Sequence, residues 1–433
     1  MVGVIPCAAE CSSFHWAFPC AWQAICVVHR LRRSFVLTYA LAALGAAALW
    51  GCRDKESGSA APAEGADARS SATAQGSAAA APTVAASSPG SAEPPKSPKA
   101  DKIVILAGGD VNFGRGAGQK ILKDPSYNPF SEIAPLLKTA DYRFVNLESQ
   151  LSDQGGETQS RNNHLVFTGP PGGAAVLARA GIDLVSLANN HAWDYGKSAL
   201  FETFEHLDKA GVAHVGARKK ATTQYEPLVV DIKGWKVAWF AVTHIWNQGP
   251  INKHEGRHYV AWASFDLLGK RLKKAVKQHD LVLLSYHGGG EYVDVPMQWT
   301  RDFYRAVLST GVHAVFGHHP HVPHGVGWVG GRPAFYSLGN LVFAMHSDYP
   351  WTGTSFFARV TFNVSGEIQV EACPYHILGH VPMPFDGKAK AARERAFGSH
   401  LKLLSLSTGG ATVGEPGEFS CVPVTPKRPP MPN

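Results

Sequence analysis

Polar residues follow five apolar runs of this chain, and that repeated arrangement constrains the fold more than any other feature of the sequence. Four of the runs read as buried β-strands, and a fifth, shorter run ends in the same way. Strands of an α/β fold present their carboxyl ends at one rim, so we expect the five patches to converge on a single site. The patches are Gly109-Asp110, Asn146-Leu147-Glu148, Asn189-Asn190-His191, His287 and Gly317-His318-His319-Pro320-His321.

The order of apolar and amphipathic segments indicates the fold class. Expected strands at 103–107, 142–146, 184–187, 235–242, 281–286 and 312–316 alternate with expected helices at 131–139, 171–180, 197–210, 265–278 and 298–309. This alternation predicts an α/β fold with right-handed crossovers. After Gly325, strand patterns at 326–329, 333–338, 355–362 and 369–372 have little helix between them. That change predicts a second, more antiparallel sheet packed on the first.

The N-terminal region has the features of an export signal. Arg32 and Arg33 precede an apolar run at 35–50, which is followed by Cys52. A run of about 16 residues is shorter than the roughly 20 that a spanning helix needs. We therefore expect a lipoprotein-type signal, with the mature protein anchored to the membrane through lipid on Cys52 and facing the periplasm or cell surface. An uncleaved membrane anchor is the alternative, and the arginine pair fits either a twin-arginine signal or a plain basic segment.

Composition divides the chain into four segments. Residues 1–52 form an N-terminal extension with the signal, and 53–101 are an Ala/Ser/Pro-rich tether that cannot bury enough apolar surface to fold. The folded domain is expected at 102–378 and a C-terminal tail at 379–433. In an exported protein Cys373 and Cys421 could form a disulfide or remain two thiols, and the sequence leaves both open.

The charge pattern limits the class of partner. The formal net charge is +7, with charged residues at only 17% of the chain. The basic residues are dispersed and form no long Lys/Arg block, so nucleic-acid binding is not expected. An anionic carbohydrate or peptide remains compatible with the charge.

The residue types in the five patches are those that bind metal. An isolated Asp after a strand is more often a turn residue, and a lone His more often belongs to the core or surface. Here, however, two carboxylates, an Asn amide and several imidazoles occur together at expected strand ends, which suits borderline divalent ions. Two metals about 3.5–4 Å apart need a bridging oxygen ligand, which Glu148 could supply. His191 could act as a general acid, with Asp194 orienting it.

Taken together and in order, the patches resemble the capsule-synthesis protein CapA family (poly-γ-glutamate capsule biosynthesis), which is related to calcineurin-like metallophosphoesterases. The matching segments are Gly109-Asp110, Asn146-Leu147-Glu148, Leu187 to Gly196, His287 with Glu291-Tyr292, Gly317 to Val322, and Ser337 to Phe343. The resemblance implies a metallophosphoesterase-like α/β/β/α sandwich of two packed mixed sheets flanked by helices. It also implies a site for two divalent metal ions, with Mn, Zn or Fe as candidates.

Carried over by position, the resemblance assigns a role to each site residue. Asp110, Glu148 and His321 would hold one metal, and Glu148, Asn190, His287 and His319 the other. His191 would be the catalytic acid. A surrounding set would support these ligands, namely Asn112, Asn189, Asp194, Glu291 and His318.

Three positions depart from typical metallophosphoesterases. Asn112 stands where they have His, Asn189 where they have Gly, and Glu148 where they have Asp. The patches therefore predict metal more firmly than a reaction. The implied function is a hydrolase acting on an amide or phosphoester of an anionic, polyglutamate-like envelope polymer or a peptide. The alternatives are a non-catalytic, metal-containing component for polymer binding or export, and a metal-assisted epimerase.

Overall fold

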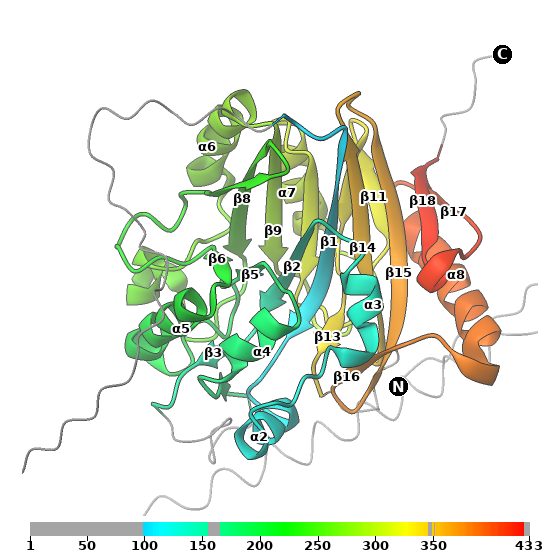
Figure 1. Cartoon of the computed structure of the whole chain (residues 1–433). Coiled ribbons are helices and arrows are strands. Elements are labelled where there is room, and N and C mark those ends of the chain that lie inside the picture. Colours follow the sequence, from blue (N-terminus) through cyan, green and yellow to red (C-terminus); the bar gives the residue numbers. More distant parts are fainter. Residues whose placement is uncertain (1–97, 155–164, 345–348, 350, 428–433) are drawn as a thin grey trace, which may run out of the picture. The chain divides into compact units, whose positions relative to one another are not determined.

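The computed structural model describes residues 98–154, 165–344, 349 and 351–427. The expected export signal, Cys52 and nearly all of the expected tether lie outside the described residues. Within them, two large sheets and the helices around them form the fold (Figure 1). No helix in this part of the chain is both long and apolar enough to cross a bilayer.

The first sheet has ten strands, and Asp110, Glu148 and Asn190 lie at or just beyond the ends of three of them. Its order is β17-β18-β15-β14-β1-β2-β5-β6, with β13 beside β1 and β16 beside β15. The bounds are β1 Lys102–Val111, β2 Tyr142–Leu147, β5 Leu184–Ser186, β6 Ala213–Val215, β13 Asn340–Val342, β14 Thr354–Asn363, β15 Ile368–Leu378, β16 Val381–Pro384, β17 Ala411–Val413 and β18 Val422–Pro426.

The second sheet has six strands in the order β11-β12-β10-β9-β8-β7, and β3 and β4 form a separate two-stranded ribbon. The bounds are β3 Gln150–Leu151, β4 Thr168–Gly169, β7 Leu228–Ile232, β8 Trp235–Thr243, β9 Leu281–His287, β10 Ala314–His318, β11 Val326–Val329 and β12 Arg332–Phe335. The α-helices are α2 Gly116–Lys123, α3 Ala134–Leu137, α4 Gly173–Arg179, α5 Gly196–Ala210, α6 Phe265–Gln278, α7 Gln298–Leu308 and α8 Lys390–Leu406. Short 3-10 helices are η1 Ser131–Ile133, η2 Ile251–Lys253, η3 Glu255–His258, η4 Gly387–Ala389 and η5 Glu418–Ser420.

Aromatic side chains join the inner faces of the two sheets. Phe144 of β2 stacks on Trp239 of β8, with ring centroids 4.9 Å apart, and Trp239 stacks on Phe316 of β10 at 6.0 Å. On the outer face of the second sheet, Leu272 of α6 and Tyr304 of α7 are fully buried in a separate apolar cluster. Helices α3, α4 and α5 cover the first sheet (Figure 1). The expected α/β sandwich of two packed mixed sheets flanked by helices is therefore confirmed.

The expectation of a separate antiparallel sheet after Gly325 is wrong. Strands β11 and β12 extend the second sheet, with β12 parallel to β10, whereas β14 and β15 extend the first sheet, with β14 antiparallel to β1. An apolar pattern specifies that a segment is a buried strand and which side chains face inward, but it does not specify the partner strand. The chain instead returns to an open edge of each sheet and adds strands there.

The sequence predicts a C-terminal tail beyond Leu378, but these residues continue the first sheet. Strands β16 and β18 both pair antiparallel with β15, and α8 lies between them in the sequence. Cys373 of β15 and Cys421, which directly precedes β18, form a disulfide. The pairing that the sequence left open is thus present, and it links the last strand to its neighbour β15.

Removing this disulfide should destabilise the domain. The two cysteines are 48 residues apart in sequence, and a closed loop of that length lowers the entropy of the unfolded chain by the equivalent of about 4 kcal/mol. We expect Cys373→Ala with Cys421→Ala to lower the free energy of unfolding by about 2–4 kcal/mol, measured by urea denaturation. Wild-type protein unfolded with and without reductant is the control, and equal midpoints there would contradict a contribution from the disulfide.

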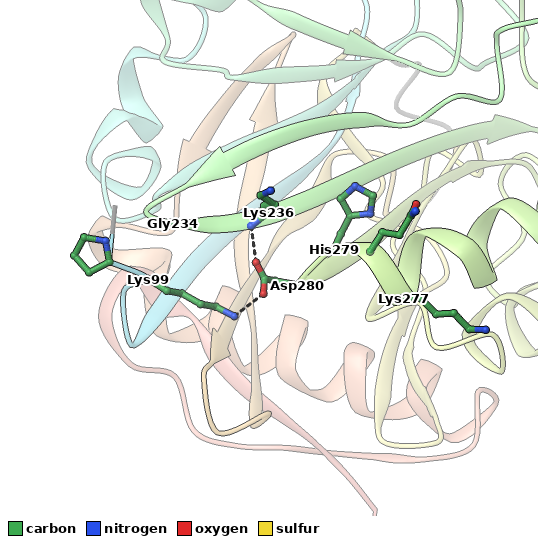
Figure 2. A pocket seen from close by; sticks show the side chains of 8 residues that line it. Lys99, Gly234, Lys236, Lys277, His279 and Asp280 are labelled. Carbon is green, nitrogen blue, oxygen red and sulfur yellow. Dashed lines mark hydrogen bonds and ion pairs between the residues drawn. The ribbon is translucent and has the colours of Figure 1, made fainter. Parts of the chain in front are cut away.

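The described chain begins beside a surface pocket of about 630 Å³ at the N-terminal ends of β8 and β9 (Figure 2). Asp280 occupies its centre, accepting a bond from Lys99 Nζ at 2.8 Å and one from the Lys236 backbone N–H at 2.7 Å. Lys99 also lies over the Trp235 ring. The seven residues of β9, at roughly 3.3 Å each, separate this pocket from His287 at the strand's other end. The pocket is therefore separate from the polar residues at the carboxyl end of β9.

Candidate metal centre

Glycines allow the strand ends to approach one another at the centre. A Cβ on Gly109 would lie 2.0 Å from the backbone oxygen of Gly339, and one on Gly317 would lie 2.2 Å from that of Tyr336. These contacts exclude any side chain at either position, because real Cβ atoms do not come that close to backbone. Strand β1 can therefore deliver Asp110, and β10 can deliver His318, at the point where neighbouring backbone crosses the ends of both strands.

The six residues that the sequence named as metal ligands lie together in one buried cluster. Glu148 Oε1 is 3.7 Å from His287 Nε2 and 3.8 Å from His321 Nε2. Asp110 Oδ2 is 3.6 Å from His321 Nδ1, and Asn190 Oδ1 is 2.7 Å from His287 Nε2. Two groups have ligand atoms within 4.8 Å of one another and could each hold an ion, namely Glu148 with His319 and His321, and Asp110 with Glu148 and His287.

The two carboxylates of the cluster have opposite pKa shifts. Burial raises the pKa of Glu148 well above its usual range, and the nearby charge of Asp110 adds to the shift. Burial also opposes ionisation of Asp110, but the contact and charge of His318, the charge of His321 and a 2.9 Å bond from Asn146 together lower its pKa. Without further positive charge, two fully buried carboxylates this close cannot both ionise at low cost.

The ligand histidines are held neutral, and two of them lie in strained backbone. Burial, followed by repulsion from neighbouring imidazoles, lowers the pKa of His287 well below its usual range, and burial with the charge of His321 lowers that of His319 to about 3. Neutral imidazole is the form that binds metal. His319 and His321 have φ values of +96° and +59°, which cost of order 1–3 kcal/mol each. Such strain at two alternate positions aims both rings at the carboxylates.

The chemistry of this donor set fits divalent metal. Among the described residues, neither carboxylate oxygen of Glu148 has a hydrogen-bond partner, and Nδ1 of His319 has none. Buried polar atoms left in this state cost about 1–3 kcal/mol each, and nearly all find partners in folded proteins. Carboxylate, amide oxygen and imidazole ligands without thiolate suit Mn, Zn or Fe. A divalent ion would both satisfy these atoms and offset the paired negative charge.

His191 lies against the cluster and is oriented from behind. Its Nε2 is 4.0 Å from Glu148 Oε1, while its Nδ1 is 2.7 Å from Asp194 Oδ2. Asp194 is itself fixed, because it accepts bonds from the Phe167 backbone N–H at 2.7 Å and from Gln248 Nε2 at 3.2 Å. The Phe167 ring lies 4.2 Å from the His191 ring. The imidazole is therefore held in one orientation, with Nε2 directed at the ligand cluster.

The other supporting residues have different positions. Asn189 builds the loop, since it donates to the Leu147 oxygen at 2.7 Å and accepts from the His191 backbone N–H at 3.1 Å. His318 is fully buried with Nδ1 3.2 Å from Asp110 Oδ1. Asn112 caps a turn by accepting from the Gly114 N–H. Glu291 is exposed and acts on Glu148 only through its charge. Among the described residues, no side-chain hydrogen bond or ion pair joins Asn112 or Glu291 to the ligand cluster.

Sequence reasoning assigned no role to two asparagines that connect the ligands. Asn146 Nδ2 lies 2.9 Å from Asp110 Oδ1 and 3.2 Å from His287 Nδ1, so it links ligands from both sheets. Asn340 Oδ1 lies 2.9 Å from His321 Nδ1. Both are fully buried polar residues at the end of an apolar strand or the start of one. An asparagine at the end or the start of an apolar strand was the sequence signal that could have identified both residues, because a buried amide needs hydrogen-bond partners.

One family model and several curated proteins are similar to this chain. Residues 104–345 match the family model described as bacterial capsule synthesis protein PGA_cap. A capsule biosynthesis protein CapA from Bacillus anthracis is 26% identical over 298 residues, covering 67% of this chain and 71% of that protein. A PGA biosynthesis protein CapA from Bacillus subtilis strain 168 is 27% identical over 300 residues, covering 68% and 77%.

Among solved structures, a putative 5'-nucleotidase from Staphylococcus aureus matches with a TM-score of 0.40 and 13% identity, covering 73% of this chain and 60% of that one. The NAD nucleotidase of Haemophilus influenzae matches with a TM-score of 0.38 and 14% identity, covering 64% and 56%. The family model spans more than half of the chain and includes every residue of the ligand cluster. The chain belongs to the bacterial capsule synthesis protein PGA_cap family.

Proposed function

We propose that the protein is a metal-dependent hydrolase that cleaves an amide or phosphoester bond in an anionic envelope polymer. The observation that carries this proposal is the position of His191, whose Nε2 lies 4.0 Å from Glu148 within a buried set of ligand-type side chains. An acid beside such a set has a use in bond cleavage that a purely structural metal site would not need. The Bacillus relatives are named for capsule biosynthesis and PGA biosynthesis, which supports an acidic capsule polymer such as poly-γ-glutamate as the substrate class.

The two ions would be held by overlapping sets of residues. Asp110, Glu148 and His321 would hold one, and Glu148, Asn190, His287 and His319 would hold the other. Divalent ions there would supply Lewis acidity toward the scissile group and a nucleophile at neutral pH. Asn146 and Asn340 would fix the ligand rings, since each bonds the nitrogen of a histidine, and partners of this kind tune metal affinity by about 10–100-fold.

His191 would protonate the departing group. With its Nδ1–H donated to Asp194 Oδ2, the ring retains Nε2 for proton exchange on the side of the ligand cluster. When protonated there, Nε2 can donate its proton to the leaving nitrogen or oxygen as the bond breaks. Asp194 would stabilise the resulting ring cation and keep the tautomer, a role that carboxylates behind catalytic histidines commonly have.

The test begins with metal analysis of the purified full chain, followed by an activity screen. We expect stoichiometric divalent metal and turnover of either p-nitrophenyl phosphoesters or γ-glutamyl anilides and poly-γ-glutamate. Asp110→Asn should lose both metal and turnover, whereas Asp302→Asn, at an exposed residue of α7, should keep both. Protein without stoichiometric metal would sink the proposal.

Two other functions are outcomes of the same screen. Metal-dependent binding of poly-γ-glutamate without turnover would favour a non-catalytic component for polymer binding or export. Exchange of the substrate's Cα proton with solvent deuterium, without cleavage, would favour metal-assisted epimerisation. Hydrolysis that requires both Asp110 and His191 would exclude the two alternatives.

We also propose that the chain is exported and anchored through lipid on Cys52. The Cys373–Cys421 disulfide supports export, because disulfides persist mainly in oxidising compartments. Wild-type protein expressed in a bacterial host should partition with membranes and take up labelled fatty acid. Cys52→Ser should abolish the label, and Cys26→Ser serves as the matched control. Label that is retained in Cys52→Ser would contradict this anchor.

A further inference from the structure

Arg115 lies at the edge of the ligand cluster. It contacts two aromatic rings, Phe167 and Phe343, that themselves pack against histidines of the centre. Its guanidinium carbon is 4.8 Å from the centroid of the Phe167 ring and 5.5 Å from that of Phe343. The Phe167 ring lies 4.2 Å from the ring of His191, and the Phe343 ring lies 4.8 Å from that of His321. Arg115 is therefore one side chain away from both the proposed acid and a proposed ligand.

The guanidinium is held in place but has few polar partners. Nη1 donates to the Ala344 backbone oxygen at 2.8 Å. No carboxylate among the described residues forms an ion pair with it, although the more distant charge of Glu148 acts to raise the pKa of Arg115. The Arg115 side chain is half-buried, so water is partly removed from this cation, and the same burial lowers the pKa of Arg115. Stacking on two rings recovers part of the lost hydration. Within the part of the chain that the structure describes, the bond to Ala344 is the only one that the guanidinium donates, so its other N–H groups can donate to a ligand.

We infer that Arg115 forms a subsite for an acidic group of the substrate, a carboxylate that neighbours the scissile bond. The inference rests on the proposed function and names its substrate class as a polycarboxylate. The planar fork of an arginine matches a carboxylate with two parallel hydrogen bonds, which a lysine cannot reproduce. Among the described residues this half-buried cation has no carboxylate partner, and an uncompensated charge that is partly removed from water is costly, so an acidic ligand would offset that cost.

The position explains how an acidic polymer could be placed for cleavage. The guanidinium lies over both the Phe167 and Phe343 rings, so a bound carboxylate would be placed relative to His191 and His321 together. A substrate lacking the acidic group would reach the ligand cluster without being oriented. Arg115 is thus a positioning residue, and its loss should weaken substrate binding more than the bond-breaking step.

The first arm of the test measures binding of poly-γ-glutamate to the full chain by titration calorimetry, independent of turnover. Arg115→Met, which keeps apolar bulk over the rings, should weaken binding by about 10–100-fold, in line with the loss of a charge-assisted hydrogen bond. Arg115→Lys should recover only part of the loss. Arg218→Met removes another half-buried arginine, one that bonds to backbone oxygens, and should leave binding unchanged.

The second arm compares γ-glutamyl anilides that carry either a free α-carboxylate or an α-carboxamide. Arg115→Met should raise KM for the carboxylate substrate by about 10–100-fold, while the carboxamide substrate changes less than about threefold. A merely structural arginine would impair both substrates equally. A phosphate-specific subsite would show instead as Arg115-dependent binding of a phosphorylated oligomer but not of poly-γ-glutamate.

The two proposals fail in different ways. Arg115-dependent binding of poly-γ-glutamate without any turnover would overturn the hydrolase but support the carboxylate subsite. Wild-type protein that does not bind poly-γ-glutamate, or Arg115→Met that binds it with wild-type affinity and full metal content, would overturn the subsite. Loss of metal in Arg115→Met would also overturn it, since the residue would then act on the centre itself.

Discussion

Glu148→Gln should remove bound metal and lower turnover by more than about a hundredfold. Losing a residue that only supports a metal ligand costs up to about a hundredfold, and losing a ligand should cost more. Glu148 contacts His191, His287 and His321 at once, so it is the residue shared by both candidate ion sites. Metal content per chain and kcat on the best substrate of the screen are the measurements. Glu132→Gln, at an exposed position of η1, is the matched control.

After the metal has been removed by a chelator, Glu148→Gln should stabilise the folded protein. Burial raises the pKa of Glu148, so the folded state holds a proton that the unfolded chain releases above about pH 4.5. Stability from this group is therefore complete at low pH and is lost as the pH rises. We expect Glu148→Gln to raise the free energy of unfolding of chelated protein by about 1–3 kcal/mol at pH 7, and by less at pH 4.5.

The order of stability of wild type and Glu148→Gln should therefore reverse when the metal is removed. Wild-type protein should be the more stable of the pair with metal and the less stable without it. Urea denaturation with and without chelator provides the comparison. Equal metal content in wild type and Glu148→Gln would remove Glu148 from the site, and equal stability after chelation would contradict the cost assigned to its burial.

His191→Asn should keep the metal and lower kcat by about 10²–10⁴-fold, the usual contribution of general acid catalysis. His191 Nδ1 already bonds to Asp194, which leaves Nε2 as the atom that exchanges the proton. The loss should be largest for substrates with a basic leaving group. It should be small for p-nitrophenyl esters, because that leaving group departs without needing a proton.

Two companion variants sharpen this result. Asp194→Asn should lower kcat by less than His191→Asn, because the acid remains but loses the partner that fixes its tautomer. His206→Asn, on α5 and only partly buried, should have wild-type kinetics. Unchanged turnover by His191→Asn on a substrate with a poor leaving group would show that another residue, or solvent, supplies the proton.

Local patterns were sufficient to predict the type of most elements and which polar residues stand at the strand ends. The amphipathic run 265–278 matches α6, and the apolar run before His287 matches β9. The polar patches were visible because ligand residues interrupt apolar runs, which core packing does not favour. The resemblance assigned Asp110, Glu148, Asn190, His287, His319 and His321 to one site, and these residues do lie together.

The sequence by itself determined which segments form strands and helices, and that carboxylates, amides and imidazoles stand at the strand ends. Only the tertiary structure decided which sheet each later strand joins, that Cys373 pairs with Cys421, and that Asn146, Asn340 and Arg115 contact the centre or the rings around it. The physical reason is range. Periodicity and capping act over a few neighbouring residues, whereas these contacts join residues far apart in the chain, whose proximity depends on how the two sheets pack together.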